Sequence, residues 1–180
     1  MIVDSNRIPD GACATTLDAP NTKLQGSATQ VGSGDDNGHV RLAGEVGVPA
    51  STRLDALGFT LQQVLFESGG VEELVRTNRR SGVVPLRLEL QPGSNKTRAV
   101  YATAPSRVPS ARAVLSRTKN GSMAFDIQVD RARMPTLPHC TGASPAAELA
   151  TRFTLDDGGN SINVLARQKW ACQGKQLRTL

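Results

Sequence analysis

Aromatic residues are scarce in this sequence of 180 residues, which has one Trp, one Tyr and four Phe. A large ligand pocket lined with aromatic rings is therefore disfavoured, and so is a platform on which nucleic-acid bases could stack. Any hydrophobic core must come mainly from Val, Leu, Ala and Ile. A thin β fold of two layers can be filled by such small side chains.

Long apolar runs are also missing. No segment approaches the roughly 18 consecutive apolar residues that mark a transmembrane helix, so we expect no membrane span. Residues 1–4 have neither the basic nor the apolar stretch of a signal peptide. If the protein is exported, we expect this chain to be a mature or excised piece of a longer one.

Catalytic motifs are equally hard to find. Only two His occur, His39 and His139, and no nucleophile elbow, phosphate loop or dinucleotide fingerprint is present. His139 and Cys140 are adjacent, and adjacent strand residues point to opposite faces, so they cannot form a nucleophilic pair within a regular strand. We therefore predict a protein that is not an enzyme and needs no cofactor.

The positive charge is spread along the chain rather than concentrated. Net charge is +5, mostly from Arg, and the densest groups are Arg76, Arg79 and Arg80, then Arg131 and Arg133. Basic charge without site geometry is more typical of a solvated surface than of a nucleic-acid site. Nucleic-acid association is kept as a second alternative only.

What the sequence does have is alternation with a period of two. The longest clean run lies near the C-terminal end and places on one strand face Ile162, Val164, Ala166, Gln168, Trp170 and Cys172. Similar runs recur at residues 40–48, 59–65, 84–90, 98–103, 111–118, 123–129 and 149–155. Turn residues separate them, and Asn120-Gly121 is the strongest hairpin signal.

This pattern predicts an all-β fold, specifically an antiparallel two-sheet sandwich. Gln62-Gln63 interrupts one run and predicts a bulge or turn, whereas residues 71–80 fit either a strand or a short helix. We expect residues 38–180 to form the domain. Residues 1–37 read as a loosely structured lead-in or the remnant of a preceding repeat, with one short strand possible near 23–31. The predicted core includes Leu88, Phe125, Ile127, Phe153, Val164 and Trp170.

The three cysteines indicate in which cellular compartment the protein resides. Cys172 shares a strand face with the only Trp, and Cys140 lies just before another apolar run, so we predict a Cys140–Cys172 disulfide, which leaves Cys13 over. Disulfides persist outside the cytoplasm, so we expect a secreted or cell-surface location. The alternative is three reduced thiols in a cytosolic protein.

Two acidic turns offer oxygen ligands of the kind that Ca²⁺ prefers. They are Asp35-Asp36-Asn37-Gly38 and the turn that contains Asp156, Asp157 and Asn160. Neither has the spacing of an EF-hand loop, and such residues are ordinary in hairpin turns. A weak calcium site at Asp156, Asp157 and Asn160 is therefore kept as a hypothesis.

Residues 123–178 resemble the immunoglobulin-like repeat domains of large bacterial surface and secreted proteins of unknown function. The resemblance rests on the strand-turn-strand pattern from Phe153 to Cys172, with Cys140 before it and Trp170 near its end. It implies adhesion, scaffolding or spacing roles and transfers no active-site residue. In antibody domains, by contrast, the Trp lies between the two Cys on another strand.

The function that these observations favour is a non-enzymatic extracytoplasmic structural or binding module. The first alternative is a carbohydrate- or surface-binding accessory domain, which an exposed aromatic platform would support. Partners would be a protein or a surface glycan, recognised through loops or an exposed strand edge. The ligand, the strand topology and the oligomeric state do not follow from the sequence.

Overall fold

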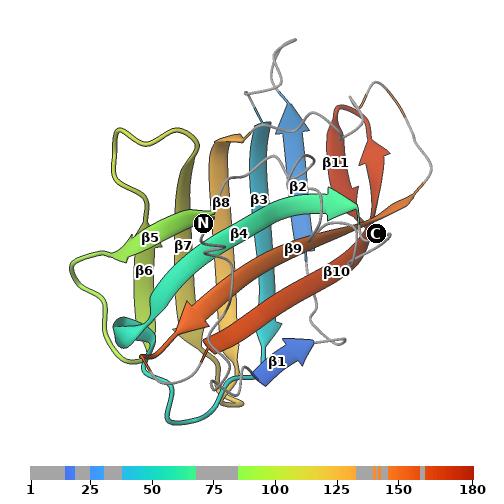
Figure 1. The fold of residues 1–180 in the computed structure, drawn as a ribbon. Helices are drawn as coiled ribbons and strands as arrows, with labels where there is room; N and C mark the ends of the chain where they lie inside the picture. Colours follow the sequence, from blue (N-terminus) through green and yellow to red (C-terminus); the bar gives the residue numbers. More distant parts are fainter. Residues whose placement is uncertain are drawn as a thin grey trace, which may run out of the picture.

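The structure, a computed structural model, is all-β (Figure 1). It describes residues 15–18, 25–30, 38–67, 85–132, 140, 142, 146–158 and 161–180. Within these ranges the chain forms eleven strands and a single 3₁₀ turn, η1 (Leu54–Ala56). The all-β class predicted by the two-residue periodicity is confirmed.

The strands follow one another with tight turns between most of the later ones. The first six are β1 (Thr15–Asp18), β2 (Gln25–Gln30), β3 (Gly38–Val46), β4 (Gly58–Glu67), β5 (Leu86–Leu90) and β6 (Arg98–Ala102). The remaining five are β7 (Ser110–Arg117), β8 (Met123–Ala132), β9 (Ala147–Asp156), β10 (Ser161–Gln173) and β11 (Gln176–Thr179).

Hydrogen bonding joins all these strands in one sheet that closes on itself. The order is β10-β11-β2-β3-β8-β7-β6-β5-β4-β9, and β9 pairs again with β10. The short β1 adds to β10 in parallel. In Figure 1, β4, β9 and β10 cross in front of β2, β3 and β8. A sandwich of two separate sheets is not confirmed, because β9 bonds to a strand on each side and links the two layers.

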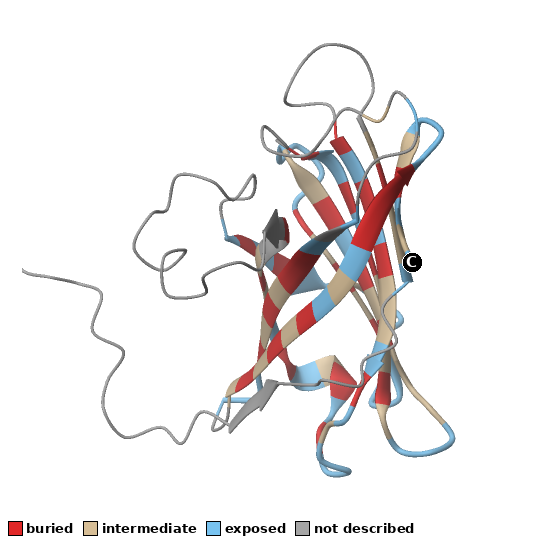
Figure 2. Ribbon diagram, turned by 90° about the vertical axis from the view of Figure 1, so that its right-hand side faces the viewer, coloured by how far each residue is buried: buried red, intermediate tan, exposed pale blue. Residues whose placement is uncertain are grey.

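The alternation that the sequence displays is the alternation of burial. Along β8, Met123, Phe125, Ile127 and Val129 are buried while the residues between them are exposed or half-buried, and Figure 2 shows the same banding on the other strands. The predicted core is confirmed, because none of its six members is more than 3% exposed.

Aromatic side chains bridge the two layers of the closed sheet. The ring of Phe153 on β9 lies 5.2 Å from that of Phe125 on β8, edge to face, and 5.4 Å from that of Phe59 on the neighbouring β4. Since β8 and β9 are not neighbours in the sheet, the first contact crosses the interior. Edge-to-face pairs of this kind add about 0.5–1.5 kcal/mol beyond their buried area.

Local turn chemistry also follows the sequence. Gly121 has φ +85°, which a side chain would oppose, and it closes the predicted β7–β8 hairpin. The pairing of β4 with β9 shifts register on both sides of Gln63, where the sequence predicted a bulge or a turn at Gln62-Gln63.

The structure also contains strands that the periodicity does not reveal. Strands β1 and β11 have four residues each, too few for a recognisable pattern. Strand β2, by contrast, coincides with the short strand given as possible near residues 23–31, and it pairs with β3 over six residues. Residues 71–80, with their strand-or-helix alternative, lie outside the described part of the chain.

A close approach between Trp170 and Gly26 fills the interior beside β2. The indole of Trp170 is completely buried, and a Cβ built on Gly26 would overlap its ring. The Gly26 amide donates a hydrogen bond to Oγ1 of Thr179, which is the register partner of Trp170. Glycine is therefore required here by the space that the indole occupies.

Tyr101 on β6 fixes the η1 turn. Its buried hydroxyl donates to the carbonyl of Leu54 at 2.6 Å and accepts from the amide of Leu57 at 3.2 Å. Burial raises the pKa of this hydroxyl above its ordinary value of 10.0, while the hydrogen bond from Leu57 acts in the opposite direction.

Gly26→Ala should destabilise the fold, because the added methyl group must displace the indole or β2. Overpacking of this kind costs about 1–3 kcal/mol, measured from the urea midpoint of unfolding. Gly47→Ala is the matched control, because a Cβ there meets nothing within 4 Å. Equal midpoints for the two variants would contradict the packing at Trp170.

Tyr101 is the only tyrosine, so its titration can be followed by absorbance at the phenolate band. Ionisation of the native protein should begin above the ordinary pKa of 10.0. Because the native pKa is raised, the neutral hydroxyl contributes fully to the free energy of unfolding below pH 10. This contribution is lost as the pH rises through the higher native pKa. Titration at the ordinary value in still-folded protein would contradict the burial.

Candidate functional site

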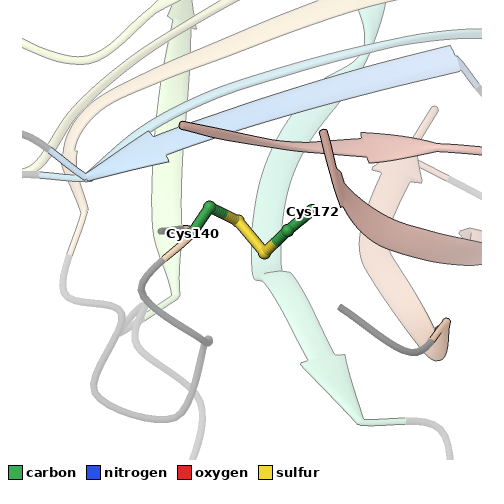
Figure 3. The surroundings of a disulfide bond; sticks show 2 residues. All are labelled: Cys140 and Cys172. Carbon is green, nitrogen blue, oxygen red and sulfur yellow. A yellow bond between two sulfur atoms is a disulfide. The ribbon is translucent and has the colours of Figure 1, made fainter. Parts of the chain in front are cut away.

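The first candidate feature is a covalent one. Cys140 and Cys172 form a disulfide with their Cα atoms 5.3 Å apart (Figure 3), as predicted. Cys172 is buried on the inner face of β10, and half-buried Cys140 packs against the core. The bond ties the segment before β9 to the end of β10, where the hairpin to β11 begins. Cys13 lies outside the described residues.

The second feature is a hollow of about 750 Å³ at the seam between β11 and β2. These two strands share only two registered pairs, Leu177 with Ala28 and Arg178 with Ser27. Beyond these pairs both strands continue without further registered pairing to each other. Its lining consists of residues 25–27 on β2, Arg41 and Ala43 on β3, Gln168 on β10, and residues 178–180.

Strand parity places the two arginines of the hollow on the outer face. Arg41 has the parity opposite to its buried neighbour Leu42, and Arg178 the parity opposite to buried Leu177, so both arginines belong to the outer face. Gly26 has the inner parity and is nevertheless half-buried. The indole of Trp170 packs against its inner side, so the hollow and the core meet at this glycine.

The charge of the hollow is positive. Its titratable side chains are Arg41 and Arg178, and no acidic residue is among its lining. Arg41 donates from Nε (3.2 Å) and Nη2 (2.8 Å) to the two carboxylate oxygens of Asp126 on β8. This hydrogen bond, and then the attraction between the charges, raise the pKa of Arg41 above its ordinary value.

Arg178 has a neutral partner instead. Its Nε and Nη2 atoms both donate to Oε1 of Gln176 on the same strand, the first at 2.9 Å. Each of the two guanidinium groups is therefore oriented by a neighbour along one edge. Neither Nη1 atom hydrogen-bonds to any other described residue, which leaves one edge of each group for a ligand.

The arginines of this face gather through pairing of strands that are distant in sequence. Strand register places in one row across the outer face Arg178, Ser27, Arg41, Gln128 and Arg112. Outward parity can be read from each strand alone, but nothing in the sequence indicates that β11, β2, β3, β8 and β7 are neighbours. Sequence reasoning therefore missed this site.

The acidic turn retained as a calcium hypothesis is a hairpin turn between β9 and β10. The Asp156 carboxylate accepts a hydrogen bond from the Gly158 amide at 2.8 Å. Asp157 is exposed beside it, and Asn160 lies outside the described residues. Within the described part of the chain no group of three His, Cys, Asp or Glu side chains is placed to hold a metal ion.

His39 lies beside an acidic partner but not in a catalytic order. Its Nδ1 is 2.7 Å from Oδ1 of Asp130, and Ser110 is the register partner of Asp130 on the other side. A Ser-His-Asp arrangement needs the imidazole between the other two, whereas here the carboxylate is in the middle.

Most of the other residues singled out from the sequence lie outside the described part of the chain. His139, the group at Arg76, Arg79 and Arg80, and Arg133 lie outside the described residues. Arg131 is described and exposed, with φ +56° beside the register shift between β3 and β8.

Among the described residues, no helix is long and apolar enough to cross a membrane. Comparison with known proteins gives no match: no protein-family model fits the chain, and no curated protein or solved structure is significantly similar to it.

Calcium should leave the unfolding midpoint unchanged, because in the described part of the chain no group of three His, Cys, Asp or Glu side chains is placed to hold a metal ion. The measurement compares thermal unfolding with excess CaCl₂ and with a chelator. Asp156→Asn, which keeps an acceptor but removes the charge, is the control. A midpoint that rises with calcium in the parent chain, and not in Asp156→Asn, would instead establish the metal site.

Proposed function

We propose that this protein is a non-enzymatic binding module that works outside the cytoplasm, on the cell surface or in secreted form. The Cys140–Cys172 disulfide carries the proposal. Disulfides of this kind form and persist in oxidising compartments and are rare in the cytosol. The bond also fixes β10 close to the β11–β2 seam, where the hollow lies.

The binding role is supported by the way the molecule separates a closed interior from a polar outer face. Five aromatic side chains lie inside the core: Phe59, Tyr101, Phe125, Phe153 and Trp170. Ligand binding through an exposed aromatic platform is therefore disfavoured for the described part of the chain. Binding would instead use the arginine, hydroxyl and amide groups around the hollow.

This arrangement of side chains supports a role in adhesion or scaffolding rather than in catalysis. The ion pair of Arg41 with Asp126 and the hydrogen-bonded pair of His39 with Asp130 are exposed to solvent and orient side chains without burying a reactive group. Partners of the module would be a protein or a surface glycan.

The thiol state of protein isolated from its native compartment tests the proposal. Alkylation under denaturing conditions without reductant, followed by peptide mass spectrometry, should label Cys13 and leave Cys140 and Cys172 unlabelled. Labelling of all three cysteines would place the protein in a reducing compartment and overturn the extracytoplasmic assignment.

Loss of the bond should also lower stability measurably. It closes a loop with a sequence separation of 32, for which the chain-entropy model gives about 3–4 kcal/mol. The double substitution of Cys140 and Cys172 by Ala should lower the free energy of unfolding in urea by about this amount, and so should reduction of the parent chain. Cys13→Ser is the control and should leave it unchanged.

A further inference from the structure

We infer that the hollow at the β11–β2 seam binds an acidic saccharide, with its carboxylate or sulfate group on the guanidinium of Arg178 and its hydroxyls on the neighbouring polar side chains. This inference rests on the proposed binding function and names its ligand class. It follows from the size, charge and hydrogen-bonding groups of the hollow.

Size is compatible with a small ligand. Sites for small molecules occupy about 300–1,000 Å³, and the hollow has about 750 Å³. Arg178 and Arg41 stand on strands separated by β2, so their backbones are about 10 Å apart at the usual strand spacing. An extended ligand lying across β11, β2 and β3 can therefore reach both side chains.

Charge selects an anion. Arg41 is already paired with Asp126, whereas Arg178 is held by the neutral amide of Gln176. Among the side chains of the lining, the uncompensated charge is therefore that of Arg178. Its guanidinium is oriented before the ligand arrives, and a planar fork of donors suits a carboxylate or a sulfate better than a flexible ammonium does.

Hydroxyl and amide groups select a saccharide as the carrier of that anion. Ser27, Thr179, Gln25 and Gln168 line the hollow and offer both donors and acceptors. The lining contains no aromatic side chain, so a nucleobase would find nothing to stack on. Each hydroxyl of a saccharide can both donate and accept a hydrogen bond, so it can pair with either kind of group in the lining.

Binding can be measured by calorimetry, with the fluorescence of the only tryptophan as a second signal, because Trp170 packs against the inner side of Gly26. The probes are a uronate tetrasaccharide without sulfate, a sulfated heparin tetrasaccharide, a neutral chitin tetrasaccharide, inorganic sulfate and an oligothymidylate. The first two distinguish a carboxylate from a sulfate as the recognised group.

Single substitutions distinguish binding in the hollow from nonspecific attraction to the positive charge of the protein. Arg178→Gln should weaken binding of the acidic tetrasaccharide about tenfold or more, since it removes charge-assisted hydrogen bonds. Arg112→Gln makes the same charge change on the same outer face outside the lining and should change affinity less than twofold. Asp126→Asn removes the negative charge that compensates Arg41 and should tighten binding. Unchanged urea midpoints would establish that each variant is folded.

Equal losses in Arg178→Gln and Arg112→Gln would mean nonspecific attraction and overturn the inference. So would binding of the neutral tetrasaccharide as tight as that of the acidic ones, preference for the oligothymidylate, or no binding of either acidic probe. None of these results would bear on the extracytoplasmic location, which the cysteine alkylation experiment tests separately. A wrong ligand class can therefore be distinguished from a wrong compartment.

Discussion

Closure of the sheet is the constraint on which the rest of the structure depends. Strand β9 bonds to β4 on one side and to β10 on the other, and the opposite side closes through the short β11–β2 seam. Only two registered pairs hold that seam. Packing of the Trp170 indole against Gly26, and the hydrogen bond from Gly26 to Thr179, stabilise it from the inside.

A chain with so few aromatic residues can fill this closed interior because it uses them at the points of contact between layers. Phe125 meets Phe153 across the interior, and Phe59 connects that pair to Tyr101. Small residues occupy other inner positions, such as Ala99 and Ala113. The facing strands can then approach closely, and a few rings suffice to fill the space.

The β11–β2 seam, which Trp170 and Gly26 stabilise from the inside, also carries the proposed binding site on its outer face. Because β11 and β2 part after two pairs, side chains from four strands border one hollow. Its arginines are exposed and oriented by Asp126 and Gln176, while the disulfide restrains the neighbouring end of β10. A rigid support with oriented polar groups is the arrangement that selective binding requires.

The sequence alone determined the β class, the inward face of most strands, the interruption of a strand at Gln62-Gln63, the hairpin at Asn120-Gly121 and the Cys140–Cys172 pair. Each of these depends on local periodicity, turn chemistry or side-chain parity. Tertiary structure decided that the sheet is one closed layer rather than two separate sheets, that β2 and β11 belong to it, and that Arg41 and Arg178 border one hollow. Those features depend on which strands pair across long stretches of sequence, such as β11 with β2 and β3 with β8. A two-residue period carries no information about the identity of a strand's neighbour.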